Sequence, residues 1–172
     1  MLLMTLVLTL AATTADPVPA PPATPAPKCL AAEYRQFDFW IGQWDVVNTK
    51  DGTSAGSSLI EKLYAGCVIR ENWSEPGFSG GSLNLYDERE KRWHQTWTDS
   101  QGSWREFAGG LVDGKMVLVW KHPSAKERGV TVQERMIFTP NPDGSVRQYS
   151  DESKDGKTWV ERYDYTYKRH TP

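Results

Sequence analysis

The residues in this sequence that could do chemistry are carboxylates and amides placed two positions away from tryptophans. Glu71 stands two residues before Trp73, and Gln95 lies midway between Trp93 and Trp97. Side chains at this spacing share one face of a β-strand. Polar groups that converge on aromatic walls are what a small-molecule site requires. We expect one such lumenal site, lined by Glu71, Trp73, Asn84, Trp93, Gln95, Trp97, Trp104 and Glu106.

No catalytic residue is assigned by a motif. The sequence contains no Gly-x-Ser-x-Gly, no His-Glu-x-x-His, no phosphate-binding glycine loop and no Cys-x-x-Cys. Burial of Glu71 or Glu106 would raise its pKa toward neutrality, and the carboxyl could then act as a general acid or base. Because the sequence contains none of these catalytic motifs, we favour non-enzymatic binding of a small ligand. An enzyme that uses one of these carboxyls is the alternative. No metal site is predicted, because no ligands are spaced to join the two cysteines.

Composition limits the classes of partner. Of the 172 residues 24% are charged, and the net charge is −2. This balance gives no electrostatic basis for binding nucleic acid or an anionic membrane. All 20 aromatic residues lie in positions 29–172. That segment is long enough for one domain with a real core. No oligomeric state is predicted.

The N-terminus indicates export. Residues 1–15 contain an uncharged apolar run of signal-peptide length, too short to span a bilayer, although no Lys or Arg precedes it. Residues 16–28 are rich in proline, which predicts an extended, disordered tether. We expect a secreted or periplasmic protein with a single domain over residues 29–172. After cleavage of the signal no stable membrane insertion is expected.

Two cysteines, Cys29 and Cys67, are present. In an exported protein an even number favours a disulfide, which would join the start of the domain to its body. The alternative is a buried Cys67 thiol with a free Cys29.

Turn residues recur at short intervals between runs rich in Val, Ile, Thr, Trp and Tyr, which is typical of an antiparallel all-β domain. A meander of this length tends to close on itself and remove its edges. We expect ten strands, at residues 39–48, 56–64, 67–73, 80–86, 92–98, 104–111, 115–121, 129–139, 145–151 and 158–168.

The expected site depends on strand register. If Tyr86 pairs with Trp93, Asn84 faces Gln95, and if Trp97 pairs with Trp104, Gln95 faces Glu106. A slip of one residue would turn this face to solvent. The alternative interior face is apolar and carries Phe107, Leu111, Leu118 and Trp120.

Early in the first expected strand, Gly42 and Trp44 form a Gly-x-Trp motif. This resembles the start of the lipocalin and fatty-acid-binding (calycin) barrels. The resemblance implies that Trp44 closes one end of the barrel under a basic residue from near the last strand, here Arg162 or Arg169. Lidded calycins insert helices between their first two strands. Residues 49–55 are too few for that, so we expect no helical lid.

Residues 37–46, 66–71, 92–97 and 143–148 are similar to segments of the DUF1579 family of exported bacterial proteins. The resemblance covers nearly all of residues 29–169. It implies a lipocalin-like barrel and brings no established activity.

Three functions follow as expectations. The favoured one is a lipocalin-like barrel that binds a small, partly apolar ligand without catalysis. The alternatives are a periplasmic enzyme that uses Glu71 or Glu106, and a structural or interaction module whose barrel is filled by side chains. No cofactor is expected; haem held by His94 or His170 is a minor alternative suggested by some barrels of the calycin superfamily.

Overall fold

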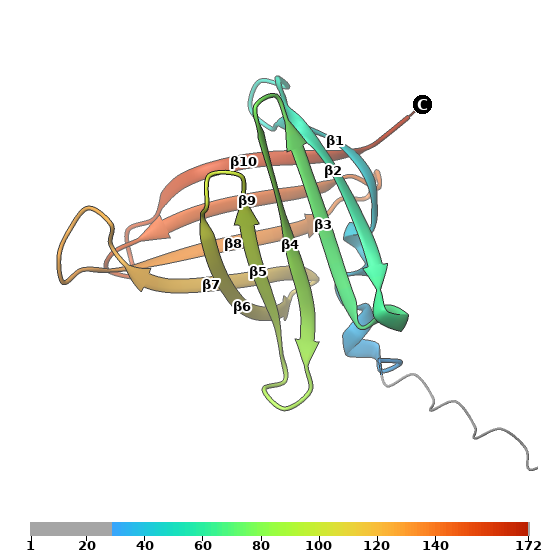
Figure 1. Cartoon of the computed structure of the whole chain (residues 1–172), viewed down its shortest axis with the longest axis horizontal. Coiled ribbons are helices and arrows are strands. Elements are labelled where there is room, and N and C mark those ends of the chain that lie inside the picture. The colour runs from blue at the N-terminus through green and yellow to red at the C-terminus, as the bar shows by residue number, and fades with distance from the viewer. Residues whose placement is uncertain (1–28, 172) are drawn as a thin grey trace, which may run out of the picture.

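The computed structural model describes residues 29–171, so the predicted signal peptide and tether lie outside the described residues. These residues form one closed antiparallel barrel in which each strand pairs with its neighbours in sequence and β1 also pairs with β10 (Figure 1). This confirms the predicted up-and-down barrel. Its strands are β1 (Gly42–Asn48), β2 (Ser54–Leu63), β3 (Val68–Glu75), β4 (Phe78–Asp87), β5 (Arg92–Asp99), β6 (Trp104–Val112), β7 (Lys115–Pro123), β8 (Thr131–Pro140), β9 (Val146–Ser153) and β10 (Val160–Arg169).

Short turns enforce the meander. Asp113 and Gly114 join β6 to β7, and both have positive φ (49° and 77°), as a two-residue hairpin turn requires. Only residues 49–53 separate β1 from β2, so no helical lid lies between them, as predicted. Within residues 29–171, no helix has the length and apolar character needed to cross a bilayer.

One end of the barrel is filled by the N-terminal segment, which contains the 3-10 turns η1 (Ala32–Arg35) and η2 (Asp38–Trp40). Phe37 and Trp40 are fully buried and stack with their ring centroids 4.9 Å apart. Phe37 also packs edge-on against Trp93 and Phe138. The prediction that the first strand starts at residue 39 was wrong. The chain turns inward there to bury Trp40, and β1 begins only at Gly42.

Trp44 and Arg169 complete this end. The Trp44 indole donates a hydrogen bond to the Trp40 carbonyl (2.8 Å), and the Arg169 guanidinium lies 3.9 Å from the centre of the Trp44 ring. Arg169 also donates to the Ile41 carbonyl (2.6 Å). A Cβ at Gly42 would lie 2.0 Å from Nη1 of Arg169, so this closure requires glycine. The structure thus selects Arg169 rather than Arg162 as the closing residue.

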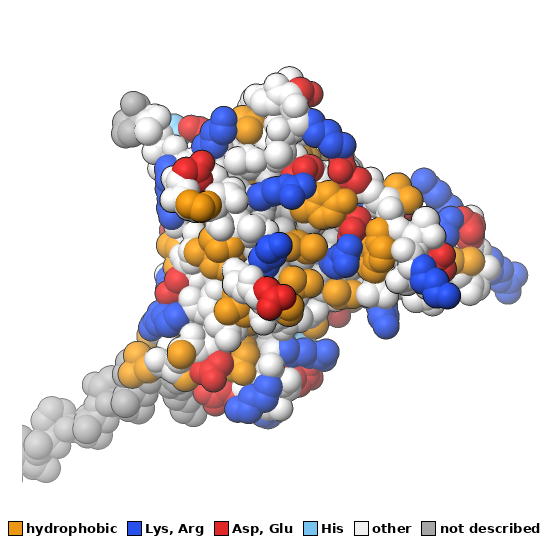
Figure 2. All heavy atoms as spheres, turned by 180° about the vertical axis from the view of Figure 1, so that it is seen from behind, with side chains coloured by type: hydrophobic (Ala, Val, Ile, Leu, Met, Phe, Trp, Pro, Cys, Tyr) orange, Lys and Arg blue, Asp and Glu red, His pale blue; other side chains and the backbone are white. Residues whose placement is uncertain are grey.

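A disulfide joins Cys29 to Cys67, as predicted. It attaches the start of the filling segment to the residue before β3. Figure 2 shows basic and acidic side chains intermixed over the face that it displays, with apolar side chains scattered between them.

Removal of this disulfide should lower the free energy of unfolding without changing the barrel. The bond closes a loop with a sequence separation of 38 residues. The chain-entropy relation then gives a loss of about 3–4 kcal/mol for the double variant Cys29→Ser/Cys67→Ser. Urea unfolding with and without reductant provides the measurement. Equal midpoints for wild type and variant would show that the bond does not stabilise the domain.

Candidate ligand-binding cavity

The half of the barrel away from the filling segment contains a partly open cavity of about 230 Å³. Its deepest lining residues, among them Glu71, Gln95 and Tyr167, are almost completely buried. Glu75, Phe78 and Asp99 stand at strand ends and mark its entrance. The lining residues are Glu71, Trp73, Glu75, Phe78, Gln95, Trp97, Asp99, Arg105, Phe107, Met136, Gln148, Tyr163, Tyr165 and Tyr167.

Most of the residues expected in the lumen are inside the barrel. Glu71, Trp73, Gln95 and Trp97 line the cavity. Two others are buried beside it. Asn84 accepts a hydrogen bond from the Gln95 amide (2.7 Å), and Trp93 packs against the filling segment and donates to the Gln36 side chain (3.1 Å). The predicted pairs of Tyr86 with Trp93 and of Asn84 with Gln95 are both confirmed.

Trp104 and Glu106 are not in the lumen, so this part of the prediction was wrong. Trp104 pairs with Thr98 instead of Trp97, which shifts β6 by one residue against β5. Because side chains alternate along a strand, the shift turns Trp104 and Glu106 outward. Trp104 is 56% exposed, and Glu106 is also exposed.

The same shift brings Arg105 and Phe107 to the interior, opposite Trp97 and Gln95. The sequence did contain a signal for this, since Phe107 and Leu118 belong to the alternative apolar face and both are buried. Arg105 itself was missed. The alternative face is interior only in part, because Leu111, near the β6–β7 hairpin, is 42% exposed.

Three tyrosines of β10 were also missed as site residues. Tyr163, Tyr165 and Tyr167 line the cavity. Their spacing of two predicts a shared face, but the sequence does not say which face is interior. A bulge between Glu161 and Tyr163 separates them from Trp159. Trp159 instead packs on the guanidinium of Arg135, 4.1 Å from its ring centre.

Two strand glycines make room for the tryptophans of the cavity wall. A Cβ at Gly80 would lie 2.5 Å from Cζ2 of Trp97, and one at Gly56 would lie 2.8 Å from Cζ2 of Trp73. Glycine inside a strand often marks such a close approach. These two positions therefore hold the indole rings back against the wall and leave the centre of the cavity open.

The buried carboxyl of Glu71 forms the polar centre of the floor. Ser82 Oγ donates to its Oε2 (2.9 Å), and Ser58 Oγ donates to its Oε1 (3.3 Å). The Tyr167 hydroxyl lies 3.4 Å from the same Oε1 and 2.7 Å from Oε1 of Gln148. Burial raises the pKa of Glu71 to about 7, and the surrounding hydroxyls oppose only part of that shift.

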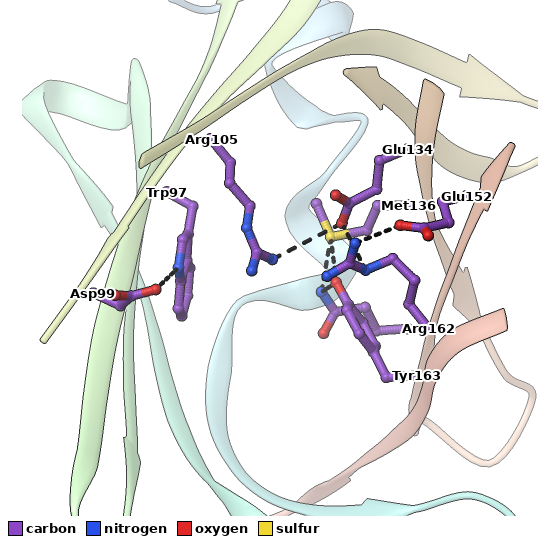
Figure 3. Close-up of polar contacts among 9 residues, drawn as sticks. Trp97, Asp99, Arg105, Glu134, Met136, Glu152, Arg162 and Tyr163 are labelled. Atoms are coloured by element: carbon purple, nitrogen blue, oxygen red, sulfur yellow. Dashed lines mark hydrogen bonds and ion pairs between the residues drawn. The ribbon is translucent and has the colours of Figure 1, made fainter. Parts of the chain in front are cut away.

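A chain of charged side chains lies beside the cavity (Figure 3). Glu134, 1% exposed, stands between two guanidinium groups, with its Oε1 3.9 Å from Nη1 of Arg105 and 3.6 Å from Nε of Arg162. Arg162 also binds Glu152 at 2.6 Å. Trp97 is fixed by a hydrogen bond from its indole to Asp99 (3.0 Å).

The histidines considered for haem do not line the cavity. His94 contacts Glu90 across the β4–β5 hairpin, and His170 contacts Asp45. The side chains of Asp87, Glu90 and His94 come close enough to hold an ion, but Glu90 already binds Arg92. Neither histidine can supply a ligand to a group in the lumen from this position.

No family model matches the chain, and no curated protein matches it. The resemblance to the DUF1579 family therefore stays a prediction.

Glu71 should make the stability of the protein depend on pH. Its carboxyl has a pKa of about 7 in the folded protein and 4.5 as its ordinary value, so the folded state holds the proton more tightly. The free energy of unfolding should fall as the pH rises from about 4.5 through about 7, by on the order of 3 kcal/mol from this group. Urea unfolding at pH 5 and pH 8 measures the loss.

The variant Glu71→Gln should abolish most of this pH-dependent loss, whereas Glu106→Gln, on the outer surface, should keep it. If Glu71→Gln lost as much unfolding free energy between pH 5 and pH 8 as the wild type, Glu71 would not be the group responsible.

Gly80→Ala should push the Trp97 ring away from β4. Overpacking of this kind costs about 1–3 kcal/mol, and the tryptophan fluorescence should change with it. Gly110→Ala is the matched control, because a Cβ there meets no atom within 4 Å. If both variants unfolded at the same urea concentration, the lack of a side chain at Gly80 would not be needed to accommodate the Trp97 indole.

Proposed function

We propose that the protein is an exported lipocalin-like barrel that binds a small, partly apolar ligand in the cavity. The observation that carries the proposal is an open volume of about 230 Å³ with aromatic walls and a polar floor. A water molecule takes about 30 Å³ of liquid volume, so the space exceeds what a few waters fill. This favours a binding protein over a barrel filled by side chains.

The size of the cavity limits the ligand. An engineered apolar cavity of about 150 Å³ holds benzene, and pockets for drug-sized ligands begin at about 300 Å³. The cavity here lies between these values. The ligand that it suits is one aromatic or alicyclic ring with a few substituents, rather than a long acyl chain or a macrocycle such as haem.

Export is supported by the apolar run in residues 1–15, the proline-rich stretch that follows, and the Cys29–Cys67 bond. Disulfides persist mainly in oxidising compartments. The proposed location is therefore outside the cytoplasm, secreted or periplasmic, with the barrel displayed after the proline-rich segment.

Acid–base catalysis by Glu71 is a second candidate function. A carboxyl with a pKa of about 7 on a cavity wall has the proton affinity of a general acid or base. Glu106 no longer supports this reading, because it lies on the outer surface. If the protein is an enzyme, Glu71→Gln should still bind the ligand and lose turnover.

Native mass spectrometry of the protein purified from its own cells tests the binding function. We expect a small molecule that leaves on denaturation, and calorimetric binding of a neutral ring such as indole to the emptied protein. Phe107→Trp should reduce binding by filling the cavity. Leu83→Phe, which adds bulk on the outer face, should not. A protein that carries no small molecule and binds no ring compound would contradict the proposal.

A further inference from the structure

Among residues 29–171, Arg105 is the only basic residue that lines the cavity. Its side chain is 29% exposed, and its nearest acidic atom, Oε1 of Glu134, is 3.9 Å away. That distance is too long for a hydrogen bond. Within residues 29–171, Arg105 donates no side-chain hydrogen bond in the structure, although a guanidinium offers five N–H donors. The group is thus available to an acceptor inside the cavity.

The charge of Arg105 is only partly balanced by the protein. Glu134 is shared with Arg162, which approaches the same oxygen more closely, at 3.6 Å. Arg162 is itself held by Glu152. The buried Glu134 carboxylate therefore attracts Arg105 into position without occupying its donors. A guanidinium presented in this way suits a planar two-oxygen acceptor.

The acidic groups around the cavity do not offset Arg105 in its interior. Asp99 is already engaged by the Trp97 indole and by the backbone N–H groups of Gln101 and Ser103. Glu75 stands at the entrance, at the end of β3. Glu71 on the floor is protonated over much of the range below neutral pH, because burial raises its pKa to about 7.

The walls favour a flat ligand. Trp73 and Tyr165 lie nearly parallel, with an interplanar angle of 20°, and Tyr163 stacks on Tyr165 with an angle of 17°. Figure 3 shows Trp97 and Arg105 on one side of the space and Tyr163 on the other. A planar ring between these sides would contact aromatic faces while its substituent reaches the guanidinium.

This inference rests on the proposed binding function and narrows it: we propose that the ligand is a small planar organic acid whose carboxylate pairs with Arg105. The ring lies among Trp73, Trp97 and Tyr165, and the two carboxylate oxygens accept from the guanidinium.

Three probes of similar size test the proposal by titration calorimetry at pH 6, where the Glu71 carboxyl is largely protonated: benzoate, benzamide and benzylammonium. Benzoate should bind at least about tenfold more tightly than benzamide, as a charged hydrogen-bonded pair requires, and benzylammonium should bind more weakly still. Arg105→Gln should remove the preference for benzoate and leave the affinity for benzamide within about twofold. Arg92→Gln, which changes an exposed arginine on the outer hairpin, should preserve the preference.

A second variant protects the test against misfolding, since Arg105→Gln leaves the buried Glu134 with one partner fewer. Arg105→Gln/Glu134→Gln removes both charges and should show the same loss of preference, with circular dichroism reporting an intact barrel. Arg105→Lys should keep part of the preference for benzoate, because lysine retains the positive charge but cannot donate the two parallel hydrogen bonds of a guanidinium.

Three results would overturn the proposal. Equal binding of benzoate and benzamide would indicate a neutral ligand, and preference for benzylammonium would indicate an aromatic site for a cation; in both cases the binding function would stand. No binding of any of the three probes would refute the organic acid. The proposed binding function itself would be refuted only if, in addition, indole did not bind and no small molecule co-purified with the protein.

Discussion

The pairing register between β5 and β6 is the constraint on which the character of the cavity depends. Gln95 stands opposite Phe107, and Trp97 opposite Arg105. A slip by one residue would exchange the two faces of β6 and place Glu106 inside the barrel with Arg105 outside. The lumen would then hold one more carboxylate and no cation on this wall. The register therefore decides the charge of the site. The pairing of β1 with β10 closes the barrel and so surrounds the site with strands.

The two halves of the barrel interior differ in the kind of side chain that they bury. At the filled end, Phe37, Trp40 and Trp44 are completely buried and belong to one apolar core. At the other end, buried polar groups satisfy one another in pairs, such as Asn84 with Gln95 and Tyr167 with Gln148. Such groups are costly without partners. These hydrogen-bonded pairs place polar groups at fixed positions in this half of the barrel.

The sequence predicted what depends on local patterning. The ten strands follow from turn residues and alternation, and the closure of Trp44 by a basic residue near the last strand follows from one motif. The location of Arg105 did not follow, because the β5–β6 loop permits either register and both faces of β6 carry plausible interior residues. Tyr163 could be placed on a face with its neighbours, but only the closed sheet shows that this face is the inner one.

Five tryptophans of the interior fall into two groups along the same division. Trp40, Trp44 and Trp93 are buried in the filled end, whereas Trp73 and Trp97 lie against glycines on the cavity wall. The first group closes the barrel. The second lines an open space, which a barrel filled by its own side chains would not need.

Crystallography of the protein isolated from its own cells would show what occupies the cavity. We expect non-water electron density for a flat molecule between Trp73 and Trp97, with two oxygen atoms within hydrogen-bond distance of the Arg105 guanidinium. A cavity that contains only water, or one closed by Trp97 turning inward, would contradict this expectation.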